Sequence, residues 1–392
     1  MATQPDLLTY YADEDETIVP RDQQESEEDV RPEPGRLNDA VLFNTDWTVE
    51  TLSRQIDKGN INLDPQFQRR EAWGVDRKSK FIESIVCNLP IPNVVLAEDR
   101  ATKGRYLVID GKQRLFAIAS FLRGEFVLRD LTIRSDLNGF SFADLHANHH
   151  QDVTTIENYT IRTVVIRNWP DEDYLYTVFY RLNSGSLQLS PQELRKALHA
   201  GKLLDFLDDF VRNSGEFKLI FGDKLDPRMR DVELVLRFVA FDKSFTDYKG
   251  DLKVFLDETV KFYDDVWDQT LPLLQSSLER LSIALEAAHA VFGSDVFKKW
   301  NGSGFERRIN RAVFDVITRY FSDAQIADRA KAQSVPVVEA FKALCAESEK
   351  FRNSIERTTK TPSATWARHI LWGEQLAAVL GAKLDEKSMR LV

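Results

Sequence analysis

Residues 106–124 read YLVIDGKQRLFAIASFLRG, and they change from a strand pattern to a helix pattern within one short turn. The apolar run of residues 106–109 is typical of a buried strand. From Leu115 to Leu122 the apolar residues recur at helical spacing, and Gly124 ends the run. A strand followed at once by a helix predicts an α/β unit whose polar turn residues lie at the helix N-terminus.

The turn between this strand and helix has the features of an anion site. Unpaired backbone N–H groups at a helix N-terminus attract anions, and Gly111 leaves room for a phosphate to approach. Lys112 and Arg114 add positive charge, and Gln113 offers both a donor and an acceptor. Asp110 could hold a metal ion or orient a water, but Asp-Gly is also common as a plain turn with the aspartate as a helix cap. The sequence leaves both interpretations open.

The length of the chain and its charge distribution predict that it has three parts. The chain has 392 residues, enough for two domains, and its hydrophobic content of 43% supports a globular protein. Residues 1–40 carry 12 acidic and 3 basic side chains, a net of −9 against −10 for the whole chain. We predict a disordered acidic tail over residues 1–38, either simply solvated or shielding a basic site. An α/β domain over residues 39–200 and a mainly helical domain over residues 201–392 would complete an α+β protein.

The chain has no run of about 18 apolar residues, and its N-terminus lacks the basic and apolar segments of a signal peptide. We therefore expect a soluble, cytoplasmic protein without a membrane partner. Cys87 and Cys345 are the two cysteines, and both fall within apolar helical patterns. Buried thiols are favoured over a disulfide or a metal pair.

Basic charge is concentrated around the turn. Residues 66–134 hold 13 basic and 8 acidic side chains, a net of +5 in an acidic protein. Such a stretch is usually a solvated surface, but Gln68, Arg69 and Arg114 lie in two loops that could meet, and paired arginines suit phosphate. Beyond the strand of residues 106–109, the predicted elements of this domain are helices at 48–58, 76–88 and 171–182 and strands at 93–97 and 159–166.

One local concentration of imidazole occurs, at His146, His149 and His150. Adjacent histidines point in different directions in either regular structure, and no cysteine is near in sequence. An exposed loop is therefore favoured over a metal site.

The second half of the chain has helical periodicity throughout. A helix with Ser190 as its N-cap and Glu193 completing a capping box precedes it. Arg307, Arg308 and Arg311, with Arg319, form a basic stripe that either contacts DNA phosphates or is solvated. The predicted helices, which favour a bundle over a solenoid, are at 202–212, 229–242, 251–268, 270–292, 305–322, 336–348 and 363–380.

Several motifs in order resemble the GmrS-type N-terminal domain of prokaryotic restriction and phage-defence proteins, a relative of the ParB and sulfiredoxin fold. The family's Asp-Gly-Gln-Gln-Arg box after an apolar strand is matched here, with Lys112 replacing the first glutamine. The resemblance covers residues 46–240. Its other pieces are Gln68-Arg69 with Trp73, Pro90-Ile91-Pro92, residues 181–185, residues 189–195 and the helical tract 228–238.

The resemblance implies a small ParB- and sulfiredoxin-like domain that binds an NTP with Mg²⁺ and, in some members, hydrolyses it in concert with nuclease action on DNA. It implies that Asp110 serves the metal or a water, so that Asp110 and Arg114 would be catalytic in a nucleoside triphosphatase. The nucleotide-binding residues that it implies are Gln68, Arg69, Gly111, Lys112, Gln113, Arg114 and Asn183.

Longer relatives carry a separate C-terminal nuclease module of the His-Asn-His type. The histidines after residue 200, His289 and His369, lie in no such motif, so autonomous DNA cleavage is not expected. Two functions follow. The first is an NTP-binding, and in one version NTP-hydrolysing, switch that acts with DNA or a separate nuclease subunit. The second is a non-hydrolysing DNA-binding adaptor that recruits such a nuclease. The base of the nucleotide and the oligomeric state stay open.

Overall fold

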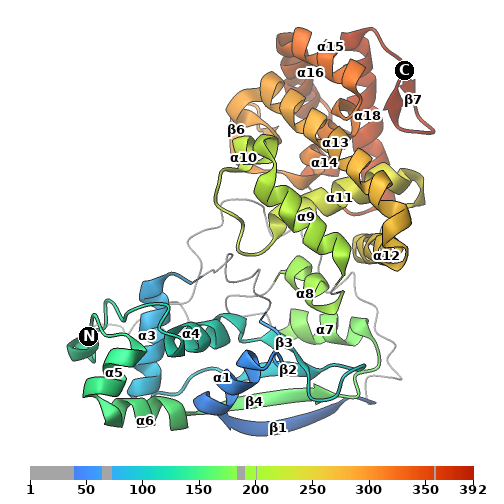
Figure 1. Cartoon of the computed structure of the whole chain (residues 1–392). Coiled ribbons are helices and arrows are strands. Elements are labelled where there is room, and N and C mark those ends of the chain that lie inside the picture. The colour runs from blue at the N-terminus through green and yellow to red at the C-terminus, as the bar shows by residue number, and fades with distance from the viewer. Residues whose placement is uncertain (1–38, 64–72, 183–189, 200, 357–358) are drawn as a thin grey trace. The chain divides into compact units, whose positions relative to one another are not determined.

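The computed structural model describes residues 39–392 except 64–72, 183–189, 200 and 357–358 (Figure 1). The described residues form two compact units, the first ending at Leu198 and the second covering His199–Val392. The division lies beside the predicted boundary after residue 200. The first unit contains a mixed sheet and the second is mainly helical, which confirms the predicted α+β class. The predicted acidic tail lies outside the described residues.

A four-stranded sheet forms the centre of the first unit, in the order β1-β4-β2-β3. β1 pairs antiparallel with β4, β4 runs parallel to β2, and β2 pairs antiparallel with β3. Three of these strands were expected from their apolar runs; β1 was not, because it is an edge strand whose side chains are mostly exposed. The strands are β1 (Val41–Thr48), β2 (Val94–Glu98), β3 (Tyr106–Asp110) and β4 (Thr160–Arg167).

Both faces of this sheet are covered. Because side chains alternate along a strand, Ile109 and Val95 lie on one face, where they join a core cluster with residues of α7 (Glu172–Leu182) and α8 (Pro191–Leu198). Val108 and Leu96 lie on the other face and are also buried. The remaining helices of the unit pack on one another, and they are α1 (Val49–Asp57), α3 (Val75–Val86), α4 (Lys112–Leu122), α5 (Phe142–Asn148) and α6 (His150–Asn158).

The second unit is a bundle of helices with two small hairpins. The 26-residue helix α13 contacts α10, α14, α15 and α16. Its helices are α9 (Lys202–Asn213), α10 (Gly215–Phe221), α11 (Arg230–Ser244), α12 (Leu252–Asp265), α13 (Trp267–Phe292), α14 (Arg311–Phe321), α15 (Ala324–Ala332), α16 (Ser334–Glu347), α17 (Glu349–Glu356) and α18 (Pro362–Leu380). The hairpins pair β5 (Lys298–Trp300) with β6 (Phe305–Ile309) and β7 (Leu384–Asp385) with β8 (Arg390–Leu391).

Two predicted segments differ from the structure. The histidine-rich segment expected as a loop is helical, because a capping box between Ser141 and Asp144 starts α5 and α6 follows at His150. The helix expected over residues 305–322 is instead the strand β6 followed by α14. Asn310 separates the two, since its side chain accepts the N–H of Val313 as the N-cap of α14.

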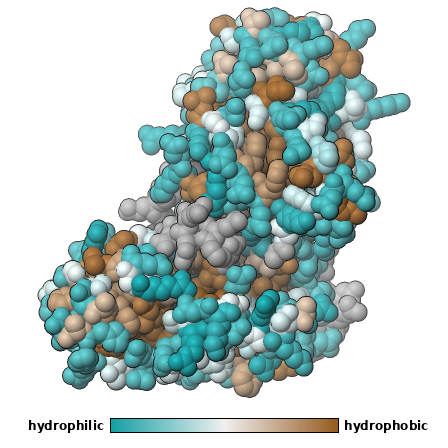
Figure 2. Space-filling model, in the orientation of Figure 1, coloured by the Kyte–Doolittle hydropathy of each residue, from teal (hydrophilic) through white to brown (hydrophobic). Residues whose placement is uncertain are grey.

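The surface seen in Figure 2 is mostly hydrophilic, with hydrophobic residues scattered over it. Of the helices in the described part of the chain, none has both the length and the apolar character that spanning a lipid bilayer requires.

Candidate functional site

A single residue, Gly111, separates β3 from α4, so the very short loop expected from the sequence is confirmed. Its φ is +96°, in the left-handed region that favours glycine. A Cβ built on this residue would lie 2.9 Å from Cγ2 of Val94, on the neighbouring strand. The loop therefore requires glycine both for its backbone conformation and for its close approach to β2.

Asp110 and Arg114 form an ion pair across this loop. Nη2 of Arg114 donates to Oδ2 of Asp110 at 2.6 Å and to the backbone carbonyl of Asn93 at 2.9 Å. The guanidinium therefore joins the end of β3 to the residue that precedes β2. The alternative in which Asp110 caps the helix is wrong, because Gly111 occupies the N-cap position and no side chain caps α4 there.

The two partners of this pair differ in exposure. The side chain of Arg114 is 10% exposed and that of Asp110 is 26% exposed. Nε of Arg114 is buried and has no hydrogen-bond partner among the described residues. Arg114 thus holds the carboxylate from the protein side, while Oδ1 of Asp110 takes no part in the pair and belongs to a side chain that solvent reaches.

The first N–H groups of α4 are the second feature of the loop. The carbonyl of Gly111 accepts the N–H of Leu115, which is the first bond of the helix. The N–H groups of Lys112, Gln113 and Arg114 precede that bond, at the end of the helix where N–H groups lack intrahelical partners. The helix dipole gives this end a partial positive charge. Backbone donors and a partly exposed carboxylate therefore meet in one loop.

Lys112 connects the loop to α8. Its Nζ lies 3.8 Å from Oε1 of Glu193, and both side chains are buried. Oε2 of Glu193 accepts the N–H of Ser190 at 2.7 Å, and the N–H of Glu193 donates to Oγ of Ser190 at 3.0 Å. This reciprocal pair is the capping box expected from the sequence. The carboxylate that starts α8 is thus the one that faces the lysine of the loop.

Three predicted nucleotide-binding residues, Gln68, Arg69 and Asn183, lie outside the described residues. Gln113 is half-buried at the start of α4. Trp73, which the resemblance also included, is 5% exposed, and its ring packs edge-on against Phe81 at a centroid distance of 5.6 Å. Among these residues only Trp73 has a clear structural role, as part of the core.

The predicted basic stripe does not form on one helix face. Arg307 is exposed and Arg308 half-buried in the strand β6. Arg311 is the first residue of α14, 1% exposed, and its Nη2 donates to Oε2 of Glu233 at 3.0 Å. The prediction of three aligned surface arginines is wrong because Arg311 is in the core. DNA contact by Arg307 and Arg308 stays a prediction.

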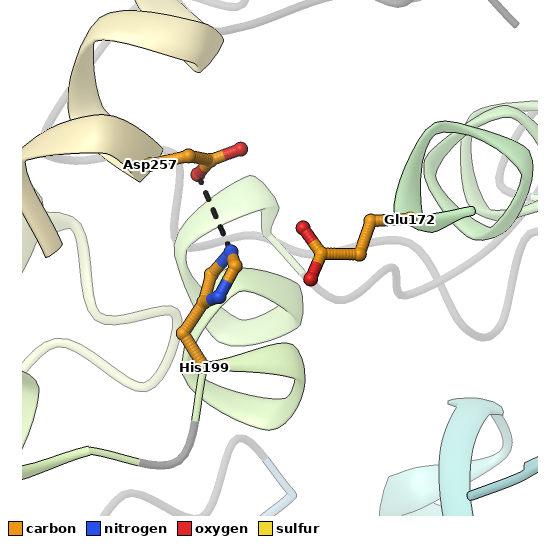
Figure 3. A group of neighbouring side chains, drawn as sticks. All are labelled: Glu172, His199 and Asp257. Atoms are coloured by element: carbon orange, nitrogen blue, oxygen red, sulfur yellow. Dashed lines mark ion pairs between the residues drawn. The ribbon is translucent and has the colours of Figure 1, made fainter. Parts of the chain in front are cut away.

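A buried histidine ion pair in the second unit was not expected from the sequence. Nε2 of His199 lies 3.9 Å from Oδ1 of Asp257 (Figure 3). Both side chains are largely buried. Oδ2 of the same aspartate forms an ion pair with Nζ of Lys253 at 3.0 Å. The partners are distant in sequence, and no motif joins them, so only the tertiary structure reveals the pair.

Residues 49–200 match the family described as GmrSD restriction endonuclease, N-terminal domain. This part of the chain therefore has the N-terminal domain of that family, which suggests a component of a restriction or phage-defence system. The Asp110–Arg114 loop and α8 both lie within the matched residues, whereas the tract of residues 228–238 lies beyond them. No curated protein and no solved structure shows significant similarity to the chain.

Proposed function

We propose that the protein is an NTP-binding switch of a restriction or phage-defence system and that the loop from Asp110 to Arg114 binds the nucleotide with Mg²⁺. The observation that carries this proposal is the combination, in one loop, of a glycine with positive φ, an uncapped helix N-terminus and a carboxylate held in place. These are the groups that a phosphate and its metal ion require.

The phosphate is proposed to lie against the backbone N–H groups at the start of α4. Gly111 is the N-cap of α4 and offers these groups no side-chain acceptor, so an oxyanion can take that place. The guanidinium of Arg114 adds formal positive charge beside the turn, because its Nη2 would lie 3.2 Å from a Cβ built on Gly111. Its charge is worth more there than on the surface, because the side chain is largely withdrawn from water.

Asp110 is the proposed contact for magnesium. Mg²⁺ prefers carboxylate oxygens, and Asp110 offers one oxygen beyond the one that Arg114 engages. When bound, the ion would neutralise charge on the phosphates that the loop holds. Arg114 fixes the orientation of the carboxylate, so the two residues act together, one as metal contact and one as its support.

Lys112 connects the proposed nucleotide site to α8 through its ion pair with Glu193. A phosphate at the loop would compete with Glu193 for the ammonium group of Lys112. Glu193 also caps α8, the last helix before residue 199, where the helical unit begins. Nucleotide binding would therefore alter the start of α8, which is how we propose that the signal leaves the site.

The second candidate is a DNA-binding adaptor that binds nucleotide without hydrolysing it and recruits a separate nuclease subunit. The small number of carboxylates favours this candidate, because Asp110 is the one acidic side chain in the loop from Asp110 to Arg114. Hydrolysis needs a positioned water as well as metal and charge stabilisation. Exposed Arg307 offers one contact for DNA phosphates in such an adaptor.

One experiment separates these candidates. Thermal unfolding of the full chain with Mg²⁺ and each of the four NTPs would identify the nucleotide that stabilises it. Phosphate release is then measured with that nucleotide, with and without DNA. Stabilisation with release supports the hydrolysing switch, and stabilisation without release supports the adaptor. If no NTP raises the unfolding temperature, both candidates are contradicted.

A further inference from the structure

The strand β1 lies at the edge of the sheet and lacks the usual protection of an edge strand (Figure 1). It pairs with β4 on one side, and no described strand lies on its other side. Edge strands are normally short, bulged or protected by proline or lysine, because their unpaired N–H and C=O groups otherwise bind another strand. β1 is eight residues long, contains no proline or lysine and pairs regularly with β4 throughout. Its outer edge can therefore accept a further strand.

The side chains at the start of β1 are apolar and exposed on both faces of the sheet. Val41, Leu42 and Phe43 are 50%, 61% and 48% exposed. Because side chains alternate along a strand, Val41 and Phe43 lie on one face and Leu42 on the other. The guanidinium of Arg167 lies 5.0 Å from the ring centroid of Phe43, yet about half of Phe43 stays exposed. A strand that fits this edge needs apolar side chains on both of its faces.

A sequence of this kind occurs in the segment that directly precedes β1. Residues 7–11 read LLTYY and form the longest apolar stretch of residues 1–38, all of which lie outside the described residues. In an extended strand Leu7 and Tyr11 would lie on one face, and Leu8 and Tyr10 on the other. Aromatic side chains favour strands and pair well across them with apolar neighbours. The sequence of residues 7–11 therefore matches the apolar character of both faces at β1.

The length of the intervening chain allows residues 7–11 to reach β1. Ala12 to Asp39 are 28 residues. A flexible chain of that length spans about 30 Å on average, whereas a strand of the length of β1 extends over about 27 Å. Such a tether keeps the segment at an effective concentration on the order of millimolar, above that of a second copy in dilute solution. The chain's own segment is therefore favoured over a second copy as the occupant of the edge.

We propose that residues 7–11 add to the outer edge of β1 as a fifth strand of the sheet and cover Val41, Leu42 and Phe43. Backbone hydrogen bonds would hold the added strand, and its leucine and tyrosine side chains would remove the apolar edge from water. The added strand would prevent β1 from pairing with another chain. This role concerns the apolar residues of the N-terminal segment and is independent of the nucleotide site.

The test is hydrogen–deuterium exchange of the full chain, measured at the amides of residues 41–48. The amides of β1 that point away from β4 should be protected in the wild type. The double substitution Leu8→Asp with Tyr10→Asp should speed their exchange by roughly tenfold or more, because the added strand is lost. Ile18→Asp with Val19→Asp, which adds the same charge outside the segment, should leave it unchanged. Equal exchange in the Leu8 and Tyr10 variant and the wild type would overturn the proposal.

A second measurement uses the unaltered protein and distinguishes its own segment from a second copy. Protection of the outward amides of β1 by residues 7–11 of the same chain should be the same at widely different protein concentrations. Protection that appears only as the concentration rises would assign the edge to a second copy and contradict the proposal. Outward amides that exchange as fast as those of an unfolded peptide would contradict it as well.

Discussion

Arg114 and Arg311 both lie at the start of a helix that follows a strand, yet they have different roles. Arg114, in the sheet-containing unit, pairs with a carboxylate that is 26% exposed. Arg311, in the helical unit, pairs with Glu233 where both side chains are almost completely buried. The first pair leaves a carboxylate available to a ligand, and the second is part of a charged core.

The difference shows what burial does to an ion pair. At the loop, the carboxylate of Asp110 is partly exposed, so the Asp110–Arg114 pair can rearrange around a phosphate and a metal ion at a lower cost than a fully buried pair. In the core, removal of one partner leaves a charge that water cannot reach. We therefore expect substitutions in the helical unit to act on stability first and substitutions at the loop to act on binding first.

The largest effect is expected for Asp315→Ala. This carboxylate serves Arg237 and Arg368, and its side chain is 0% exposed. Its removal should lower the free energy of unfolding by about 3–5 kcal/mol, measured by urea denaturation, because two buried guanidinium groups lose their partner. Asp328→Ala is the matched control, since Asp328 is 75% exposed and pairs with Lys331 on the surface. A loss below about 1 kcal/mol for Asp315→Ala would contradict the account of the charged core.

Gly111→Ala should have the next largest effect. The left-handed backbone strains any other residue by about 1–2 kcal/mol, and the methyl group would press on Val94. Gly104→Ala separates these causes, because Gly104 has a φ of +81° but open space around its Cβ. Urea denaturation should show a larger loss at Gly111 than at Gly104. Equal losses would mean that close packing against β2 contributes nothing.

A smaller effect is expected from His369, whose ring is buried. Burial holds the pKa of His369 well below its usual value of 6.5, and the nearby guanidinium of Arg368 acts in the same direction. Below pH 6.5 the unfolded chain takes up a proton that the folded protein does not, so stability falls as the pH decreases. The slope from this residue approaches about 1.4 kcal/mol per pH unit.

The measurement for this residue is urea denaturation at several pH values for the wild type and for His369→Gln. The substitution should flatten the dependence between pH 6.5 and the lower pKa of the folded protein. His150→Gln, at an exposed position, serves as the control. A pH profile of His369→Gln that parallels the wild type would show that the buried ring is not the source.

The strand, loop and helix around Asp110 could be predicted from sequence because their signals are local. Four apolar residues, a glycine and a helical repeat define them without reference to the rest of the chain. The partner of Lys112 could not be predicted, since Glu193 is distant in sequence. The edge strand β1 has exposed apolar side chains, and its sequence lacks the regular alternation of apolar and polar residues by which a half-buried strand is recognised.

The prediction of a single helix over residues 305–322 was wrong for a physical reason. The segment keeps apolar residues at spacings that a helix and a strand share, and only Asn310 marks the change as an N-cap. The charge of Arg311 did not reveal that the residue is buried, because a sequence does not show whether an arginine lies in water or pairs with a carboxylate such as Glu233. The tertiary fold decides whether Arg311 is a surface ligand or part of the core.

The central claim, that the Asp110–Arg114 loop binds an NTP, is tested most directly by calorimetric titration of the selected nucleotide with Mg²⁺. Arg114→Ala should weaken binding by about 2 kcal/mol or more, a factor of roughly 30, because it removes a charge-assisted contact and the support of Asp110. Arg123→Ala, at the other end of α4 and paired with Asp57, should bind like the wild type. Equal affinity of wild type and a folded Arg114→Ala would contradict the account.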